Sequence, residues 1–291
     1  MDIWNLCELQ ECRAHIHTQM PSADVTERFD KWGGSPRYVL QKLDLEDQAA
    51  LQQAIDSCSV KLVQDSLGNS SAHEEVSNRV LHLRVKADFI NTYTTWASPW
   101  VAEQIAYKLW RTERQQLQLF LNAGTGLSDL GGVRGNLWEG LCHARLAAGG
   151  TYCCRNLDHP DSDPFGKSFP RSTNAKVFDQ WSSLQQCADD TYCRPRVKNK
   201  AAVDSALLPE ALFQITVSGS HSINCAGLLD SLNGLRSSTA VVTLYFVVPP
   251  DRFPTFKKQT IAQGTGVAEL RQNVRQCVLE MPFQPSDNNV M

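Results

Sequence analysis

The chain has 291 residues, of which 42% are hydrophobic and 20% are charged, a composition typical of a folded globular protein rather than a disordered or collagen-like one. Lysine and arginine total 28 against 31 for aspartate and glutamate, which gives a formal net charge of −3. The chain therefore lacks the global positive field that many nucleic-acid-binding proteins use, and any contact with nucleic acid is expected to be local.

Membrane and secretory segments are not expected in this sequence. The longest largely apolar stretch, residues 241–250, is far below the roughly 18 to 20 residues that a membrane-spanning helix needs. Residues 1–20 carry several charges and no apolar core, so they do not form a secretory signal. Ten cysteines are scattered over a long chain, and we expect them to be mostly reduced thiols.

The first part of the chain is predicted to be helical. Within residues 1–58, Val25, Phe29 and Trp32 recur at the spacing of an amphipathic helix, and two glycines then end it. The helical pattern continues over residues 59–130, which we interpret as a connector ending in the glycine-rich segment NAGTGLSDLGG. The expected N-terminal region is therefore all-helical.

From residue 131 to residue 291 the pattern changes to helices alternating with strands. A helix is predicted over residues 136–148, and the polar, proline-punctuated residues 158–200 are interpreted as a long loop with a short helix near residues 176–187.

A strand-helix-strand unit follows in this part. Strands are predicted over residues 201–208 and 212–217, a helix over residues 223–235, and a buried apolar strand over residues 241–248. Strand, helix and buried strand in that order indicate a crossover between parallel strands, so we predict an α/β unit with a mixed sheet flanked by helices.

Polar side chains on the second predicted strand suggest a site. Gln214 and Thr216 share one face because strand side chains alternate, although a merely solvent-facing side would look the same. A two-residue turn after the first strand would put Asp204 opposite Ile215, on the wrong face. A three-residue loop, or one bulge, would put Asp204 opposite Thr216 and on the face of Gln214. The site requires the second register.

Glu139 is the third candidate ligand. It lies on the predicted helix with Cys142 and Leu146 three and seven residues further on, so its face is largely apolar. The alternative is a border position whose carboxylate reaches water or a nearby basic residue. Two carboxylates and the Gln214 amide oxygen would together offer the hard oxygen ligands that Mg²⁺ takes.

These features resemble a known family. An acidic helix residue, an aspartate on a hairpin and a polar-x-polar strand resemble the PD-(D/E)xK core of restriction enzymes. Four successive segments resemble signatures of Crinkler effectors and of the related trypanosomatid retrotransposon-hot-spot proteins. These segments are WGGSPRYVL, GNLWEGLCHARLAAGG, VDSALLPEALFQITVSGSHSI and LYFVVPPDRFPTF.

The resemblance implies three regions and a site. Residues 1–58 would be the remnant of an AAA-like NTPase lid, residues 59–130 a helical connector, and residues 131–291 a restriction-endonuclease-like nuclease domain. The expected site consists of Glu139, Asp204, Gln214 and Thr216, of which the first three would hold Mg²⁺. Thr216 stands where the family has lysine, a charge that a hydroxyl does not supply.

The resemblance also implies secretion and delivery to the host nucleus, with DNA and host nuclear proteins as partners. His221, shortly after the strand, could substitute for the missing lysine as a proton-transfer group, because imidazole titrates near neutral pH; the alternative is a capping or packing residue.

Nucleotide hydrolysis is not expected. Arg37 follows two glycines in an element that contacts a terminal phosphate in AAA-type ATPases, and here it would be vestigial. A P-loop needs GxxxxGK[ST] after a strand, and the near match Gly166-Lys167-Ser168 has aspartate at the first glycine position. We therefore expect no ATPase activity and interpret the chain as a fragment or truncated gene product.

One basic segment has the positive charge needed to bind the phosphate backbone of a nucleic acid. Its cations are Arg194, Arg196, Lys198 and Lys200. They would grip DNA or act in nuclear import, and the alternative is a solvated basic loop. The leading hypothesis is thus a Mg²⁺-dependent DNA endonuclease. The alternatives are a catalytically inactive nuclease-fold effector that binds host DNA or host proteins, and an inactive remnant of a larger gene.

Overall fold

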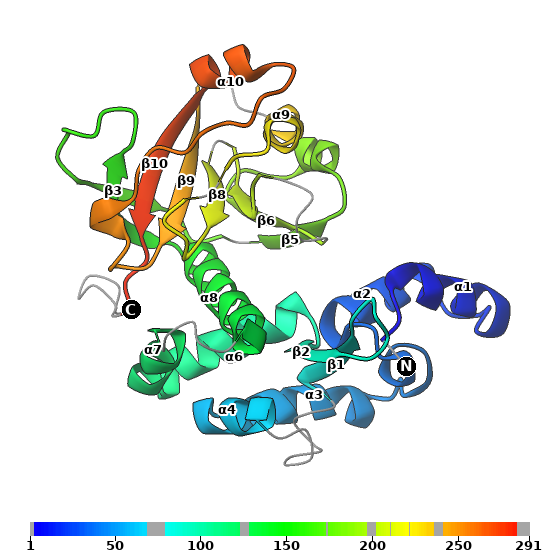
Figure 1. The fold of residues 1–291 in the computed structure, drawn as a ribbon. Helices are drawn as coiled ribbons and strands as arrows, with labels where there is room; N and C mark the ends of the chain where they lie inside the picture. Colours follow the sequence, from blue (N-terminus) through cyan, green and yellow to red (C-terminus); the bar gives the residue numbers. More distant parts are fainter. Residues whose placement is uncertain are drawn as a thin grey trace. The chain divides into compact units, whose positions relative to one another are not determined.

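The computed structural model describes residues 3–68, 79–122, 128–172, 174–196, 202–209, 211–220, 222–235 and 241–283. The chain divides into two compact units, Met1–Leu141 and Cys142–Met291, and the division falls within helix α8 (Ser128–Ala148). Figure 1 shows the helical elements of the first unit and the large sheet of the second. No helix in these described ranges combines the length and apolar character needed to cross a membrane.

The first unit consists mainly of helices. Its elements are α1 (Leu6–Ile16), α2 (Ser22–Trp32), the π-helical η1 (Arg37–Gln41), α3 (Leu45–Ser57), α4 (Val60–Gly68), β1 (Leu81–Val85), β2 (Thr92–Trp96), α6 (Pro99–Thr112) and α7 (Arg114–Asn122). The helix pattern predicted for residues 1–58 is confirmed. Local sequence explains the helix starts, because Asn5 and Glu8 form a capping box on α1 and Ser98 caps α6 ahead of Pro99.

The glycine pair after α2 forms a tightly packed corner. Gly33 has a φ of 60°, and a Cβ at this position would lie 1.9 Å from the carbonyl oxygen of Ala97. Trp32 stacks on Tyr38 at a centroid separation of 3.9 Å and donates its indole N–H to Gln48 at 2.7 Å. The glycine is therefore required here by backbone conformation and by close approach.

The antiparallel hairpin of β1 and β2 corrects the prediction of a purely helical connector over residues 59–130. Its register pairs Leu81 with Trp96 and Val85 with Thr92. Strand β2 reads TYTTW, which is rich in the β-branched and aromatic residues that favour strands. Five-residue strands are too short to show a clear period against the long helices around them.

The second unit is built on an eight-stranded mixed sheet in the order β4-β3-β10-β9-β8-β7-β6-β5. Its strands are β3 (Gly150–Asn156), β4 (Phe165–Phe169), β5 (Asn174–Phe178), β6 (Thr191–Pro195), β7 (Ser205–Leu207), β8 (Ala211–Ile215), β9 (Val242–Val248) and β10 (Val274–Glu280). Its other elements are α9 (Cys225–Gly234), α10 (Val267–Asn273) and the 3₁₀ segments η2 (Trp181–Gln186) and η3 (Phe253–Thr255). The predicted α/β class with a mixed sheet is confirmed.

The predicted crossover is also confirmed, since β8 and β9 are parallel and α9 connects them. Strand β10 pairs with β9 in parallel as well, and Figure 1 shows the three strands side by side. Leu212 of β8, Leu244 of β9 and Leu228 of α9 belong to one buried cluster. This cluster identifies the face of the sheet that α9 covers.

The polar segment of residues 158–200 is not the long loop that was predicted. It contains β4, β5 and β6, and the helical part within it is the short η2 rather than a helix over residues 176–187. β4 and β5 have mostly exposed or half-buried side chains, so they lack the apolar alternation that identifies strands in a sequence.

His82 on β1 gives the first unit a specific pH dependence. The side chain is 6% exposed, and burial together with Arg84 lowers the pKa of the imidazole from 6.5 to about 4. Between these values the unfolded chain binds a proton that the folded chain does not. Stability is therefore fully present above pH 6.5 and falls as the pH drops toward 4.

We predict that replacing His82→Leu reduces this acid sensitivity. Between pH 6.5 and 4 the free energy of unfolding should change in favour of the variant by about 1 to 3 kcal/mol relative to the wild type. Urea unfolding followed by tryptophan fluorescence at several pH values measures the difference. His15→Gln is the control, because His15 is exposed and its curve should run parallel to the wild type. Parallel curves for His82→Leu would contradict the prediction.

Candidate functional site

A carboxylate and an amide meet where β7 begins. Gln214 Nε2 donates to Asp204 Oδ2 at 2.7 Å, and the backbone N–H of Ile215 donates to the same oxygen at 2.7 Å. The backbone N–H of Asp204 in turn donates to the carbonyl of Phe213 at 2.8 Å. Asp204 is half-buried and Gln214 is 5% exposed. The structure thus brings two of the predicted site residues into direct contact.

The hairpin register explains this contact. Leu207 pairs with Ala211 and Ser205 pairs with Phe213, so three residues form the connection between β7 and β8. This register differs from the one predicted, but it keeps Asp204 on the face of Gln214, as the site requires. The partner of Asp204 is Gln214, however, and not Thr216 as predicted. Compared with a two-residue turn, the observed three-residue loop shifts the pairing by one residue. Asp204 therefore lies on the face of Gln214 and directly opposite that residue.

Gln214 carries a buried acceptor that is not satisfied. Its Oε1 has no hydrogen-bond partner in the described part of the chain, while its Nε2 is used by Asp204. A buried carbonyl oxygen without a donor costs about 1 to 3 kcal/mol, and such atoms in a folded protein call for an explanation. An oxygen of this kind beside a carboxylate fits a hard cation such as Mg²⁺.

The pair lies near one end of strand β8. Gln214 lies near the carboxyl end of β8, and Asp204 precedes the strand that runs antiparallel to it. In sheets with parallel strands, ligands bind outside the carboxyl ends of those strands. Within the described residues no cluster of three His, Cys, Asp or Glu side chains forms a metal site. The pair would therefore need the amide oxygen and further oxygen ligands.

Glu139 lies on α8 in the first unit, whereas Asp204 and Gln214 lie in the second. Its side chain is half-buried and has interaction partners of its own. Cys142 and Leu146, three and seven residues further along the helix, are buried, as the apolar pattern predicted. That Glu139 joins the pair in one site stays a prediction.

Thr216 closes the strand and is held by backbone contacts. Its N–H donates to the carbonyl of Val247 at 3.0 Å, and its Oγ1 accepts the N–H of Ser218 at 3.0 Å. The side chain is 8% exposed and carries no charge. His221 lies outside the described residues.

The basic segment is only partly a surface loop. Arg194 and Arg196 are half-buried, and Arg194 is part of β6. Arg196 Nε donates to Asp179 at 2.9 Å, so part of its charge is already paired. Lys198 and Lys200 lie outside the described residues. Arg37 is exposed at the start of η1, with its guanidinium 6.0 Å from the ring centre of Tyr38.

A buried hydrogen-bond chain lies on the other face of the sheet and was not predicted. His143 Nδ1 is 2.7 Å from the Tyr192 hydroxyl, which donates to Ser205 Oγ at 2.7 Å. All three side chains are at most 4% exposed. Tyr192 comes from the segment interpreted as a loop, so the sequence held no signal that would place it between the other two.

We predict that Asp204→Ala lowers the free energy of unfolding by about 2 kcal/mol or more, because Gln214 Nε2 and the Ile215 N–H lose their acceptor. Asp204→Asn should cost less, since one acceptor oxygen remains. Denaturant unfolding followed by circular dichroism measures both. Asp161→Ala, at an exposed position, is the control and should stay within about 0.5 kcal/mol of the wild type. An equally small change for Asp204→Ala would contradict the role of the carboxylate.

Comparison with known proteins gives two similar relatives. The chain is 27% identical over 302 residues to Crinkler effector protein 15 of Phytophthora infestans. It is also 27% identical over 309 residues to Crinkler effector protein 16 of the same organism. Each match covers 100% of this chain and 46% of the relative, so the chain spans about half the length of these curated relatives.

No family model and no solved structure matches the chain. The comparison therefore rests on two Crinkler effector proteins, to which the whole chain is similar at 27% identity.

Proposed function

We propose that the chain is a Crinkler-type effector whose second unit hydrolyses phosphodiester bonds of DNA with the help of Mg²⁺. The observation that supports this most is the buried Asp204–Gln214 pair with its unsatisfied amide oxygen, close to the carboxyl ends of parallel strands. A buried acceptor next to a carboxylate is what a hard cation needs. The restriction-endonuclease-like core and the relation to retrotransposon-hot-spot proteins belong to the same proposal.

In this proposal each residue has a defined part. Gln214 Oε1 and the Asp204 carboxylate would hold the cation, with Glu139 as a further oxygen ligand. When bound, the metal would supply activation of water and neutralisation of the charge that develops on the phosphodiester. Gln214 Nε2 and the Ile215 N–H fix the Asp204 carboxylate in position, because both donate to one of its oxygens. His221 accepts the proton of the attacking water in place of the family lysine.

The partners and location follow from the same family assignment. The basic segment with Arg194, Arg196, Lys198 and Lys200 contacts the phosphate backbone. The protein is secreted and acts in the host nucleus, where DNA and host nuclear proteins are its partners.

A second candidate is a catalytically inactive effector that keeps the nuclease-like fold to bind host DNA or host proteins. Thr216 favours it, because a neutral hydroxyl already engaged with the Ser218 N–H does not supply the charge of a lysine. In this case the Asp204–Gln214 pair acts only to hold the hairpin together.

We predict that the purified chain nicks supercoiled plasmid DNA in Mg²⁺ and not in EDTA. Asp204→Asn should slow cleavage at least about tenfold, since it removes a charged metal ligand. Thr216→Lys should speed it by restoring the charge. Gel electrophoresis over a time course measures all rates, and Asp161→Asn is the matched control with unchanged cleavage.

Two outcomes would decide against catalysis. These are no cleavage by the wild type in Mg²⁺, or equal cleavage by Asp204→Asn with a melting curve like that of the wild type. DNA binding in a gel-shift assay that survives Asp204→Asn would then support the non-catalytic candidate.

A further inference from the structure

A cavity lies in the second unit, and neither Asp204 nor Gln214 lines it. It has a volume of about 550 Å³ and lies between strand β4 and the face formed by β8, β9 and β10. The Phe169 ring of β4 is 5.3 Å from the rings of both Phe213 of β8 and Tyr245 of β9. The sheet is therefore curled, with its edge strand β4 facing its central strands. The cavity is thus built by the fold of one unit.

The position of this cavity separates it from the proposed metal site. Its lining includes Ala211 and Thr243, at the starts of β8 and β9, whereas Gln214 lies near the other end of β8. Its lining also includes Tyr245, whose side chain lies on the face of the sheet opposite the buried cluster under α9. Gln214 lies on the other face, because it is two residues from Leu212, a member of that cluster. The two sites therefore lie at opposite ends and on opposite faces of the same strands.

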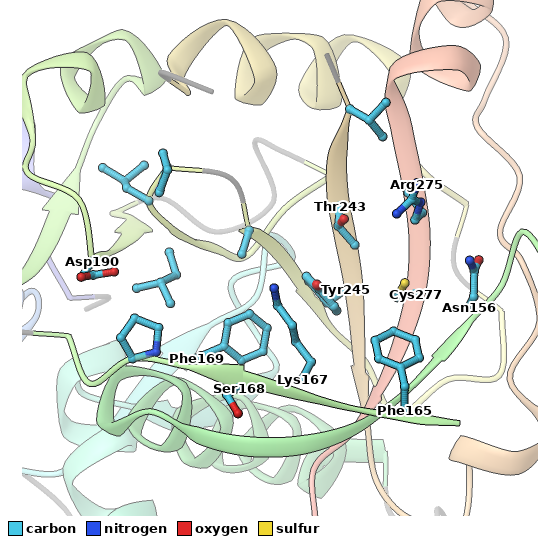
Figure 2. Close-up of a pocket in the computed structure, with 16 residues that line it drawn as sticks. Asn156, Phe165, Lys167, Ser168, Phe169, Asp190, Thr243, Tyr245, Arg275 and Cys277 are labelled. Atoms are coloured by element: carbon cyan, nitrogen blue, oxygen red, sulfur yellow. The ribbon is translucent and has the colours of Figure 1, made fainter. Parts of the chain in front are cut away.

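Two cations line the cavity. Lys167 of β4 is half-buried and Arg275 of β10 is exposed. Figure 2 shows Lys167 extending from its strand toward Thr243 and Tyr245, with Arg275 on the neighbouring strand. Neither cation forms an ion pair or a hydrogen bond with the residues that the structure describes. The carboxylate in the lining, Asp190, lies in another part of the cavity in Figure 2.

The alternation along each strand places hydroxyl and aromatic groups on the same strand faces as these cations. Phe165, Lys167 and Phe169 lie on one face of β4, and the register pairs Thr243 with Arg275. Burial raises the pKa of the Cys277 thiol, which also lines the cavity, to about 11, while Arg275 and Lys167 lower it and Asp158 raises it. The Lys167 amine is 5.7 Å from the ring centre of Phe169.

This chemistry fits a phosphorylated aromatic ligand. Unpaired lysine and arginine side chains form strong charge-assisted hydrogen bonds with phosphate, and arginine binds it through two donors. Aromatic rings offer flat surfaces for a base, and Phe165 is 42% exposed at the cavity. A volume of about 550 Å³ falls in the range of small-molecule sites.

We propose that this cavity binds a 5′-phosphorylated nucleotide, with the phosphate between Lys167 and Arg275 and the base against the aromatic side chains. The nucleotide is either free or the end of a nucleic-acid strand, because the two present the same chemistry. The proposal does not depend on the metal site or on DNA cleavage.

Isothermal titration calorimetry of the full chain in EDTA tests the proposal with AMP, adenosine and inorganic phosphate as probes. AMP should bind, adenosine should bind at least about tenfold more weakly, and phosphate should compete with AMP. Lys167→Gln and Arg275→Gln should each raise the Kd for AMP about tenfold or more, as expected for a lost charge-assisted contact. Arg271→Gln and Lys257→Gln are the matched controls, because both side chains are exposed and outside the cavity.

Binding of short single-stranded DNA, with either a 5′-phosphate or a 5′-hydroxyl, distinguishes a strand end from a free nucleotide as the ligand. Tighter binding of the phosphorylated strand than of AMP identifies a strand end, and the reverse identifies a free nucleotide. The proposal is overturned if AMP does not bind at millimolar concentration, if adenosine binds as tightly as AMP, or if Arg275→Gln binds AMP like the wild type. Arg275 is exposed, so this variant keeps the fold even where Lys167→Gln does not. Because no Mg²⁺ is present, these results are independent of the cleavage assay.

Discussion

Strand β9 is paired in parallel on both sides, with β8 and with β10, and its side chains are buried except for the half-buried Thr243. This pairing requires crossover connections, and α9 provides one of them, so one face of the sheet is covered by helix. The other face is free to meet the edge strand β4, which curls over it. Both proposed sites are consequences of this arrangement, one near each end of the same strands.

The Asp204–Gln214 pair has a structural role whether or not it holds a metal. The carboxylate accepts two hydrogen bonds from β8 and so fixes the register of the hairpin. A register shift by one residue would move Gln214 to the opposite face and separate the pair. The Gln214 Oε1 of this pair is one of several buried side-chain atoms that have no hydrogen-bond partner among the described residues.

The two proposed sites in the second unit differ in the charge of their side chains. The pair near the carboxyl ends of the strands presents oxygen atoms and suits a cation, whereas Lys167 and Arg275 on the opposite face suit an anion. The proposed hydrolysis of DNA would use both kinds of group, one toward the metal and one toward phosphate. The formal net charge of −3 is compatible with this, because the positive charge is concentrated locally.

By itself, the sequence determined the helices of residues 1–58, the crossover through α9 and the polar residues Asp204 and Gln214, because helix spacing and a buried apolar strand are local patterns. Only the tertiary structure decided the hairpin register, the strands within residues 158–200 and the cavity around Lys167. Two of those strands, β4 and β5, have mostly exposed or half-buried side chains and little periodicity. The cavity joins residues that are far apart in the chain, and they meet because the sheet curls, a property of packing that no local pattern carries.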